Sequence, residues 1–310
     1  MQQLEYITAI ADYGHFVEAA EACGVTQSTL SLMVKKLEAE LDVTIFDRNS
    51  HPVTMTKMGE RIVDKARIIL FNSRQLVEMT RSEKDQLSGH LRMAMISTVA
   101  PVLLPGMFRY FNENFPDIRL EEAEMLTTTI KDKLAKAEID IGIMASPVDD
   151  PALLEIPLYN ESFLAYVSPS CEAYSKETIE SSELFDLPLW IMRDTVHLED
   201  RNKIMEGEDF QYEKYYEGGR AGTMIQIVNE SGGMTVVPDS HVGLIMYSLH
   251  KNLRPIVNPV PKRVISLAIR RDFIHEKMLN DYGLSRLPRT ADEKRLPLLV
   301  GLPLLRIRRA

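Results

Sequence analysis

The clearest pattern of apolar and polar positions lies in the segment 16–45. Apolar residues recur there at steps of three to five, which is the spacing of one face of a helix. This predicted stripe consists of Val25, Leu30, Val34, Leu37 and Leu41. Gly24 precedes it in a tight turn, and Thr26 occupies the N-cap position, where a hydroxyl can accept a hydrogen bond from a free backbone N–H. A short helix with small residues comes before the turn, so the segment predicts a helix-turn-helix.

The second helix of such a motif presents its N-terminal end to the edges of DNA bases and its later lysines to phosphates. The expected DNA-binding residues in this helix and its turn are Thr26, Gln27, Ser28, Thr29, Ser31, Lys35 and Lys36. An ordinary helical hairpin would show the same spacing, so that alternative stays open.

Residues 44–56 follow as two short apolar stretches with a polar turn between them. This pattern predicts a β-wing that lies against the sugar-phosphate backbone, and Arg48, His51 and Thr56 are its candidate contacts. A plain turn is the alternative reading.

A proline-free helix is predicted over about residues 57–86, with an apolar seam along its length. A helix of about 30 residues, or about 45 Å, is not stable without a partner. A second copy of the same helix would provide that partner, which predicts a homodimer. A dimer would also carry the two recognition helices that a site with two half-sites requires.

From residue 89 onward, predicted strands and helices alternate, which indicates an α/β domain with a mostly parallel sheet. The segment 263–271 is a strand that we assign back to the first lobe, and an α-helix is expected at 240–248. A chain that passes between two lobes and returns forms a ligand cleft. The predicted divisions are a winged helix-turn-helix at 1–58, a linker helix at 59–88, a two-lobed effector-binding domain at 89–280 (lobe I about 89–160 and 263–280, lobe II about 161–262) and an irregular tail at 281–310.

Composition narrows the functional classes. The net charge of −9 excludes a histone-like basic coat, and acidic residues outnumber basic ones even within residues 1–57. An interaction protein that does not bind DNA therefore stays an alternative. No secretory signal and no apolar run of about 20 residues is evident, so we expect a cytoplasmic protein without a membrane partner.

Nothing in the sequence favours an enzyme, a metal site or a cofactor. The two cysteines, Cys23 and Cys171, form no CxxC or Cys/His cluster, and no GxSxG, P-loop or HExxH motif occurs.

The segment AAEACGVTQSTLSLMVKKLEAELDVTIFDR resembles the N-terminal motif of the LysR-type transcriptional regulators, and the resemblance extends over about residues 1–275. Asp42 replaces the usual glycine, and Ser28 stands where proline is commonest. The resemblance implies a winged helix-turn-helix, a linker helix and an α/β two-lobed effector domain like periplasmic binding proteins. It also implies promoter DNA, RNA polymerase and a small-molecule effector as partners, in a homodimer or homotetramer.

Within that family the sequence is most similar to the OxyR branch, which senses hydrogen peroxide. The similarity includes MQQLEYI, IFDRNSHPVTMT, STVAPVLLP and NESGGMTVVP. The branch's disulfide switch needs a peroxidatic and a resolving cysteine, but the corresponding segment here reads TVHLED, and no cysteine follows Cys171. The disulfide switch is therefore not expected, although sensing of oxidative stress by another route stays an alternative.

The resemblance also implies an effector site between the lobes. The matching positions are Ser97, Thr98, Thr127, Thr128, His197, Gly222 and Thr223. Hydroxyl groups beside helix N-termini favour a polar or anionic small molecule. Alternatively, Thr127 and Thr128 only cap a helix, and His197 only forms a hydrogen bond within its loop.

Overall fold

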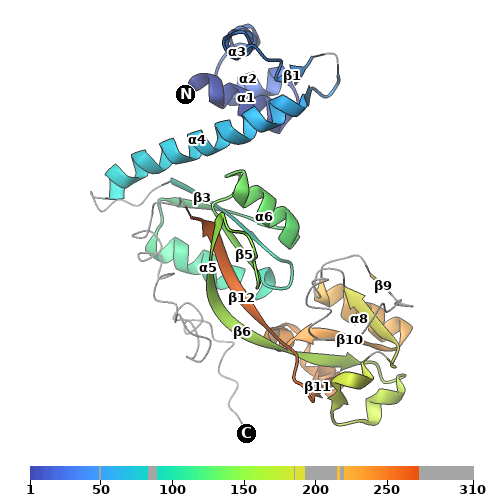
Figure 1. The fold of residues 1–310 in the computed structure, drawn as a ribbon. Helices are drawn as coiled ribbons and strands as arrows, with labels where there is room; N and C mark the ends of the chain where they lie inside the picture. Colours follow the sequence, from blue (N-terminus) through green and yellow to red (C-terminus); the bar gives the residue numbers. More distant parts are fainter. Residues whose placement is uncertain (49, 83–88, 185, 193–214, 217–219, 272–310) are drawn as a thin grey trace. The chain divides into compact units, whose positions relative to one another are not determined.

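A computed structural model describes residues 1–48, 50–82, 89–184, 186–192, 215–216 and 220–271. These residues form two compact units. The first contains the four N-terminal helices and the segment Asp132–Asp140, and the second contains most of the remaining chain. Figure 1 shows the elements in sequence colours.

The first unit confirms the predicted helix-turn-helix. Helices α1 (Gln2–Tyr13), α2 (Phe16–Ala22) and α3 (Gln27–Leu41) pack around one apolar core. Its buried residues are Tyr6, Ile7, Ile10, Ala19, Ala20, Leu30, Val34, Leu37, Ile45, Phe46, Val63 and Ala66. Leu41 departs from the predicted stripe: it is the last residue of α3 and is 47% exposed, and Asp42 after it ends the helix in the left-handed conformation.

The wing consists of β1 (Phe46–Asp47) and β2 (Thr54–Met55), which pair antiparallel. It leads into the long helix α4, which the structure describes from Lys57 to Ser82. Gly59 in the first turn of α4 lies directly against the backbone of Ile45, where a Cβ atom would come within 2.0 Å of the Ile45 carbonyl oxygen. Glycine is therefore required at this contact.

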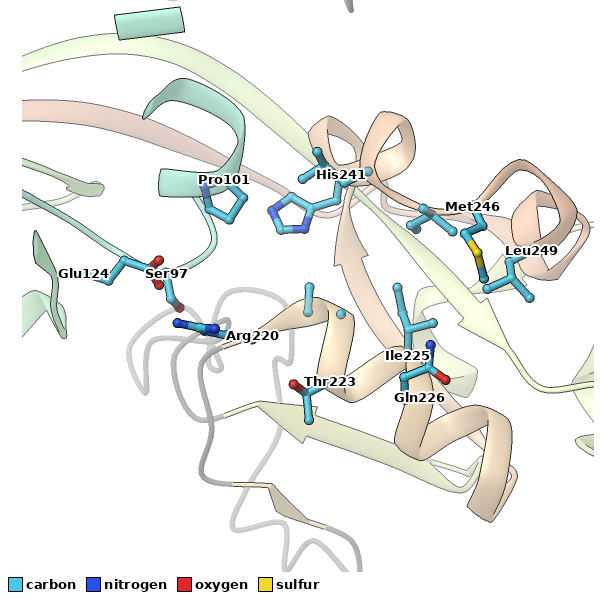
Figure 2. A pocket seen from close by; sticks show the side chains of 14 residues that line it. Ser97, Pro101, Glu124, Arg220, Thr223, Ile225, Gln226, His241, Met246 and Leu249 are labelled. Carbon is cyan, nitrogen blue, oxygen red and sulfur yellow. The ribbon is translucent and has the colours of Figure 1, made fainter. Parts of the chain in front are cut away.

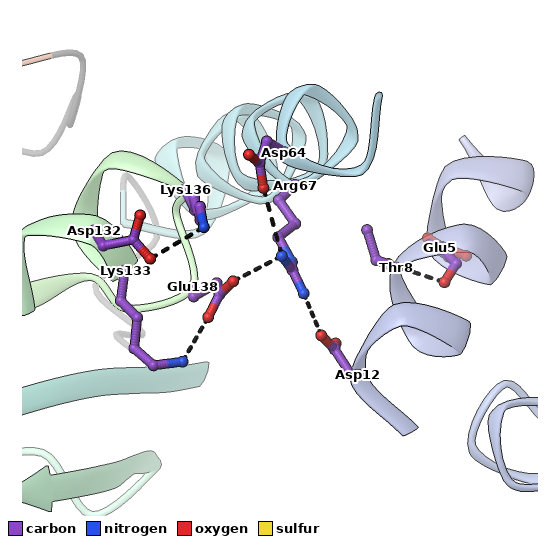
Figure 3. Close-up of polar contacts among 9 residues, drawn as sticks. All are labelled: Glu5, Thr8, Asp12, Asp64, Arg67, Asp132, Lys133, Lys136 and Glu138. Atoms are coloured by element: carbon purple, nitrogen blue, oxygen red, sulfur yellow. Dashed lines mark hydrogen bonds and ion pairs between the residues drawn. The ribbon is translucent and has the colours of Figure 1, made fainter. Parts of the chain in front are cut away.

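An arginine in α4 joins three segments of the first unit (Figure 3). The Arg67 guanidinium forms ion pairs with Asp12 of α1 and, at 2.7 Å, with Glu138. A longer contact of 3.7 Å reaches Asp64. The second oxygen of Glu138 accepts a hydrogen bond from Lys133 at 2.6 Å. Since the Arg67 side chain is only 14% exposed, this network is less screened by solvent than an ordinary surface pair.

The second unit begins with the predicted β-α-β-α-β series. The elements are β3 (Gly89–Met95), α5 (Ala100–Asn114), β4 (Ile118–Glu124), α6 (Thr127–Ala135) and β5 (Ile141–Ala145), and the residues of α6 from Asp132 onward are grouped with the first unit. Strand β3 pairs in parallel with both β4 and β5, so the prediction of a parallel sheet in this lobe is confirmed.

Two long strands continue from this lobe into the second one. They are β6 (Leu153–Val167) and β12 (Lys262–Arg270), which are neighbours in the sheet (Figure 1). Strand β12 pairs antiparallel with β5, which confirms that this strand returns to the first lobe. Strand β6 begins at Leu153, well before residue 161, where the sequence pattern placed the start of the second lobe. Pro157 and the polar residues around it hid the first half of the strand, because a proline argues against a strand interior.

The described part of the second lobe contains short strands and the α-helix α8. These are β7 (Ile179–Glu180), β8 (Leu189–Met192), β9 (Tyr215–Tyr216), α8 (Ala221–Ser231), β10 (Met234–Pro238) and β11 (Leu253–Val257), with 3₁₀ turns η1 (Glu172–Ser175) and η2 (Ser181–Glu183). Strand β10 pairs antiparallel with β6 and parallel with β8.

The α-helix predicted at 240–248 is wrong. The structure has two 3₁₀ turns there, η3 (Asp239–Leu244) and η4 (Tyr247–Asn252). Ile245 between them has an extended backbone and packs in an apolar cluster with Tyr166 and Val228, and this burial breaks the helix. Among the described helices, none is both long and apolar enough to span a bilayer.

Candidate nucleic-acid interface and ligand cleft

The N-terminal end of α3 is held by its own hydroxyl groups. The Thr26 Oγ1 atom accepts a hydrogen bond from the Thr29 backbone N–H at 3.2 Å, as expected of an N-cap. The same oxygen lies 2.9 Å from the hydroxyls of both Ser28 and Thr29. Three of the predicted DNA contacts therefore already form hydrogen bonds with one another at the start of the helix.

The solvent-facing side of α3 contains the remaining predicted contacts. Gln27, Lys35 and Lys36 are exposed there. Leu32 lies among them and is 67% exposed, although leucine is apolar. Residues three and four positions apart share a helix face, so Leu32 neighbours Ser28 and Lys35.

Arg48 ties the wing to α3. Its guanidinium forms an ion pair with Glu38 at 2.9 Å and donates a hydrogen bond to the Ser31 hydroxyl at 3.2 Å. It also lies over the ring of Phe16, 5.2 Å from the ring centre. The other oxygen of Glu38 accepts hydrogen bonds from the backbone N–H groups of Ile45 and Phe46. These contacts give Arg48 and Ser31 an intramolecular role, and their contact with DNA stays a prediction.

The other two predicted wing contacts differ from each other. The Thr56 hydroxyl donates to the Thr44 carbonyl at 2.7 Å and accepts from the Gly59 N–H at 2.9 Å, so it caps α4. His51 is exposed in the turn between the strands. Of the two, His51 has the side chain that is freely presented to solvent.

A pocket of about 550 Å³ lies between the two lobes of the second unit (Figure 2). The first lobe contributes Ser97, Pro101 and Glu124. The second lobe contributes Arg220, Ala221, Gly222, Thr223, Ile225, Gln226, His241, Leu244, Ile245, Met246 and Leu249. The volume falls in the range of small-molecule sites.

One end of the pocket is polar. The Ser97 hydroxyl oxygen is buried and has no hydrogen-bond partner among the described residues. Arg220 points from the opposite wall toward Ser97 and Glu124 (Figure 2). Arg220 also precedes α8, whose first N–H groups receive no cap from a side chain of the described residues. A Cβ at Gly222 would meet no atom within 4 Å, so this helix terminus is open to the cavity.

The other end of the pocket is apolar. Its walls are the side chains of Ile225, Leu244, Ile245, Met246 and Leu249. Burial of hydrocarbon contributes roughly 25 cal/mol per Å². The arrangement therefore suits a molecule with a polar head and an apolar body.

His241 closes the pocket at the boundary between the lobes. Its side chain is 4% exposed, and its Nε2 atom lies 2.6 Å from the Thr98 carbonyl oxygen. A carbonyl oxygen only accepts, so Nε2 carries the proton of this bond. Burial lowers the pKa of His241, and the Arg263 charge adds to this effect, while the Thr98 carbonyl and the Glu161 carboxylate oppose it. The ring is therefore neutral at pH 7, with Nδ1 as an acceptor.

Beneath the pocket lies a set of polar side chains that we name the hinge network: Thr98, Glu161, His241 and Arg263, which are buried, and Ser240, which is half-buried. The Arg263–Glu161 ion pair has side chains only 4% and 1% exposed. Arg263 also donates to the Thr98 hydroxyl at 2.9 Å, and Ser240 donates to Glu161 at 2.9 Å. The network connects the end of β3, both long strands and η3, so it joins the two lobes.

The pocket brings together only part of the effector site that the sequence suggested. Ser97, Gly222 and Thr223 line it. Thr98 is buried in the hinge network, whereas Thr127 and Thr128 begin α6 and do not line the pocket. His197 lies outside the described residues.

Sequence reasoning missed four side chains of this region: Glu161, Arg220, His241 and Arg263. A charged residue inside an apolar strand is the signal that marks Glu161 and Arg263, because such residues are rarely buried unless paired. Arg220 is the N-cap residue of α8. His241 carried no sequence signal that we recognise.

Both cysteines have free thiols. Cys171 is 7% exposed and packs in an apolar cluster with Phe163 and Ile179. Burial, and then the Glu5 charge, raise the pKa of the Cys23 thiol. A raised pKa lowers the fraction of reactive thiolate at Cys23.

A helix-turn-helix on a long helix, followed by a two-lobed domain with a small-molecule pocket, defines a DNA-binding transcriptional regulator with an effector-binding domain. Comparison with known families agrees. Residues 1–60 match the bacterial regulatory helix-turn-helix protein of the lysR family, and residues 84–280 match the LysR substrate binding domain. The chain belongs to the LysR family.

Its relatives include hydrogen peroxide regulators. It is 28% identical over 275 residues to a hydrogen peroxide-inducible genes activator of Haemophilus influenzae, covering 87% of this chain and 90% of that protein. It is 29% identical over 273 residues to the DNA-binding transcriptional dual regulator OxyR of Escherichia coli, covering 87% and 89%.

Solved structures of OxyR proteins are also similar. A full-length cysteine-to-aspartate variant of OxyR from Pseudomonas aeruginosa matches with a TM-score of 0.76 and 30% identity, covering 94% of this chain and 99% of that one. A hydrogen peroxide-bound OxyR variant from Corynebacterium glutamicum matches with a TM-score of 0.57 and 26% identity, covering 91% of each chain.

Proposed function

We propose that this regulator binds a two-part promoter site through α3 of a homodimer, and that a small organic acid in the pocket changes that binding. The observation that carries the ligand-dependent part is the polar end of the pocket. Arg220, the N-terminus of α8 and the Ser97 hydroxyl converge there, and within the described part of the chain neither the helix terminus nor the hydroxyl has a side-chain partner. Each of these groups stabilises an anion or donates a hydrogen bond to it.

Glu124 narrows the ligand class further. Its carboxylate lines the same end of the pocket as Arg220 and would repel a ligand with several negative charges. A hydroxyl or amino group beside the ligand's carboxylate would instead donate a hydrogen bond to Glu124. The proposed effector is therefore a hydroxy acid or amino acid with an apolar body that occupies the side near Met246 and Leu249.

Exposed apolar side chains on α4 support a dimer. Met58, Ile69 and Leu76 are 45%, 48% and 66% exposed on this helix. A second copy of α4 would bury them and hold two α3 helices on one assembly. Assembly of dimers into a homotetramer, contact with RNA polymerase, activation as the sign of regulation and a cytoplasmic location complete the proposal and rest on family membership.

A second candidate function is an oxidative-stress response by a route other than a disulfide. It is favoured by relatives that are named as hydrogen peroxide-inducible activators. The buried state of Cys171 argues against a thiol as the sensor.

Thermal unfolding of the full chain tests the effector proposal, with a panel of hydroxy acids and apolar amino acids and their neutral amides. Trp190 is the only tryptophan and lies in the second lobe, so its fluorescence reports on the domain that would bind. We expect at least one acid to raise the unfolding temperature and its amide to have little effect.

The Arg220→Gln variant should bind that acid roughly 10-fold more weakly, because a hydrogen bond to a charged group is worth about 1.5–3 kcal/mol. Lys251→Gln is the matched control, since it removes one exposed positive charge from the same lobe outside the pocket. Equal stabilisation of Arg220→Gln and the parent chain, or no response to any acid, would contradict the proposal.

A further inference from the structure

The face of α3 that is available to DNA has a limited set of free side chains. The hydroxyls of Ser28 and Thr29 lie within hydrogen-bond distance of Thr26, and the hydroxyl of Ser31 is bonded to Arg48. Breaking these contacts would cost the cap of the helix or the tie to the wing. The exposed side chains that remain between residues 27 and 36 of α3 are those of Gln27, Leu32, Lys35 and Lys36.

Leu32 is the apolar member of this set. At 67% exposure, it is among the most exposed large apolar side chains of the described chain. A single exposed leucine needs no explanation by itself. This one, however, lies one turn after Ser28 and one turn before Lys36, in the part of the helix that a helix-turn-helix places in the major groove.

The major groove offers one apolar group at the edges of unmodified bases, the C5-methyl group of thymine. Lys35 and Lys36 follow Leu32 by about one turn of α3, and their positive charges are suited to backbone phosphates. Leu32 therefore has a polar residue one turn before it, Ser28, and one turn after it, Lys36. This arrangement suits a thymine methyl group that lies between the two sugar-phosphate backbones of the groove. Cytosine has only a hydrogen atom at C5, so it offers no methyl group for this contact.

We infer that Leu32 is a specificity-determining residue that contacts the methyl group of one thymine in each half-site. This inference rests on the proposed placement of α3 in the major groove. Leu32 selects thymine by burying that methyl group, whereas Lys35 and Lys36 contribute affinity without base preference.

The test begins with duplexes that the full-length protein selects from a random library. In the selected site, each thymine is replaced singly by deoxyuridine, which removes only the methyl group and keeps the base pair. Loss of one buried methyl contact should weaken binding about 4-fold, and replacement in both half-sites about 15-fold. Leu32→Ala should bind thymine and deoxyuridine duplexes equally, because the side chain that senses the methyl group is gone.

Two variants serve as controls. Leu41→Ala removes another exposed leucine from the far end of the same helix and should keep the parent's preference for thymine. Lys35→Ala should weaken binding to thymine and deoxyuridine duplexes by the same factor. If Lys35→Ala binds as tightly as the parent, α3 is not the DNA-binding element and the proposed function itself fails.

If Lys35→Ala weakens binding but Leu32→Ala still prefers thymine, only the present inference is overturned. An effect seen with 5-methylcytosine but not with thymine would assign the contact to a modified base and would also overturn it. Alanine favours helices, so α3 should remain folded in Leu32→Ala, as circular dichroism would verify. A changed oligomeric state in sedimentation would place Leu32 at a protein interface instead.

Discussion

The buried ion pair of the hinge network provides the sharpest test of how the two lobes are held together. Glu161 and Arg263 are both nearly inaccessible to solvent, and each lies on one of the two long strands. The Glu161→Gln substitution keeps the shape of the side chain but removes the negative charge that forms an ion pair with Arg263. The Arg263 charge cannot be hydrated at that position, since the guanidinium is 4% exposed and lies over the ring of Phe163.

The expected loss is large. Breaking a buried ion pair by removing one partner typically costs about 3–5 kcal/mol. For a unit of this size, each kcal/mol lowers the unfolding temperature by roughly 2–4 °C, so Glu161→Gln should lower it by about 10 °C. Most of that loss is the penalty for the unpaired charge rather than the net value of the pair.

The double variant Glu161→Gln/Arg263→Met separates these two contributions. It removes the unpaired charge and fills the site with an apolar side chain, so it should recover more than half of the loss. Urea unfolding followed by Trp190 fluorescence measures all variants in the same unit. Glu183→Gln is a suitable control, because its ion pair with Lys176 is exposed and its loss should barely change the transition.

A loss below about 1 kcal/mol for Glu161→Gln would mean that water reaches Arg263 and that the hinge network is not closed. A double variant as unstable as the single variant would also refute the reasoning. It would show that the hydrogen bond from Arg263 to the Thr98 hydroxyl, and not the unpaired charge, is what matters.

Two further predictions concern protonation and oxidation. Because His241 has a lowered pKa in the folded protein, the unfolded chain binds its proton more readily, and stability should fall as the pH drops below about 6.5. His241→Gln keeps a donor for the Thr98 carbonyl and should flatten this fall in urea midpoints between pH 7.5 and 5.5; an unchanged slope would contradict the assignment. Hydrogen peroxide should leave the DNA footprint unchanged, since Cys171 is buried and the Cys23 thiol has a raised pKa. A peroxide-dependent footprint that Cys171→Ser abolishes would show that this view is wrong.

Local signals in the sequence were enough to predict the helices of the first unit. The spacing of Leu30, Val34 and Leu37 identifies the buried face of α3, and Thr26 identifies its start, because both depend only on near neighbours in the chain. The same holds for the cap of α4 at Thr56. Strand β12 could also be assigned to the first lobe from the order of elements alone.

Long-range pairing could not be predicted in the same way. Arg263 and Glu161 are 102 residues apart, and Thr98 is 165 residues from Arg263, so no local pattern brings them together. The helix predicted at 240–248 failed for a related reason. Burial of Ile245 against residues distant in sequence overrode the local helical spacing.

The predicted effector residues that line the pocket are those next to element boundaries. Ser97 follows a strand, and Gly222 and Thr223 begin a helix, so their positions at the cleft follow from the order of elements. Thr127 and Thr128 also begin a helix but lie away from the pocket lining. Which helix terminus faces the cavity is set by the packing of whole lobes and not by the terminus itself.

The contacts of Arg48 limit which residues can be changed when this regulator is engineered to bind a new promoter. Glu38 and Ser31 lie on the recognition helix, yet they anchor the neighbouring wing through that one guanidinium. A helix transplanted whole from another regulator would lose this anchor unless it carried the same two residues. Positions 27, 32, 35 and 36 can be randomised in a library. Ser31, Glu38 and Arg48 should be kept unchanged as a set.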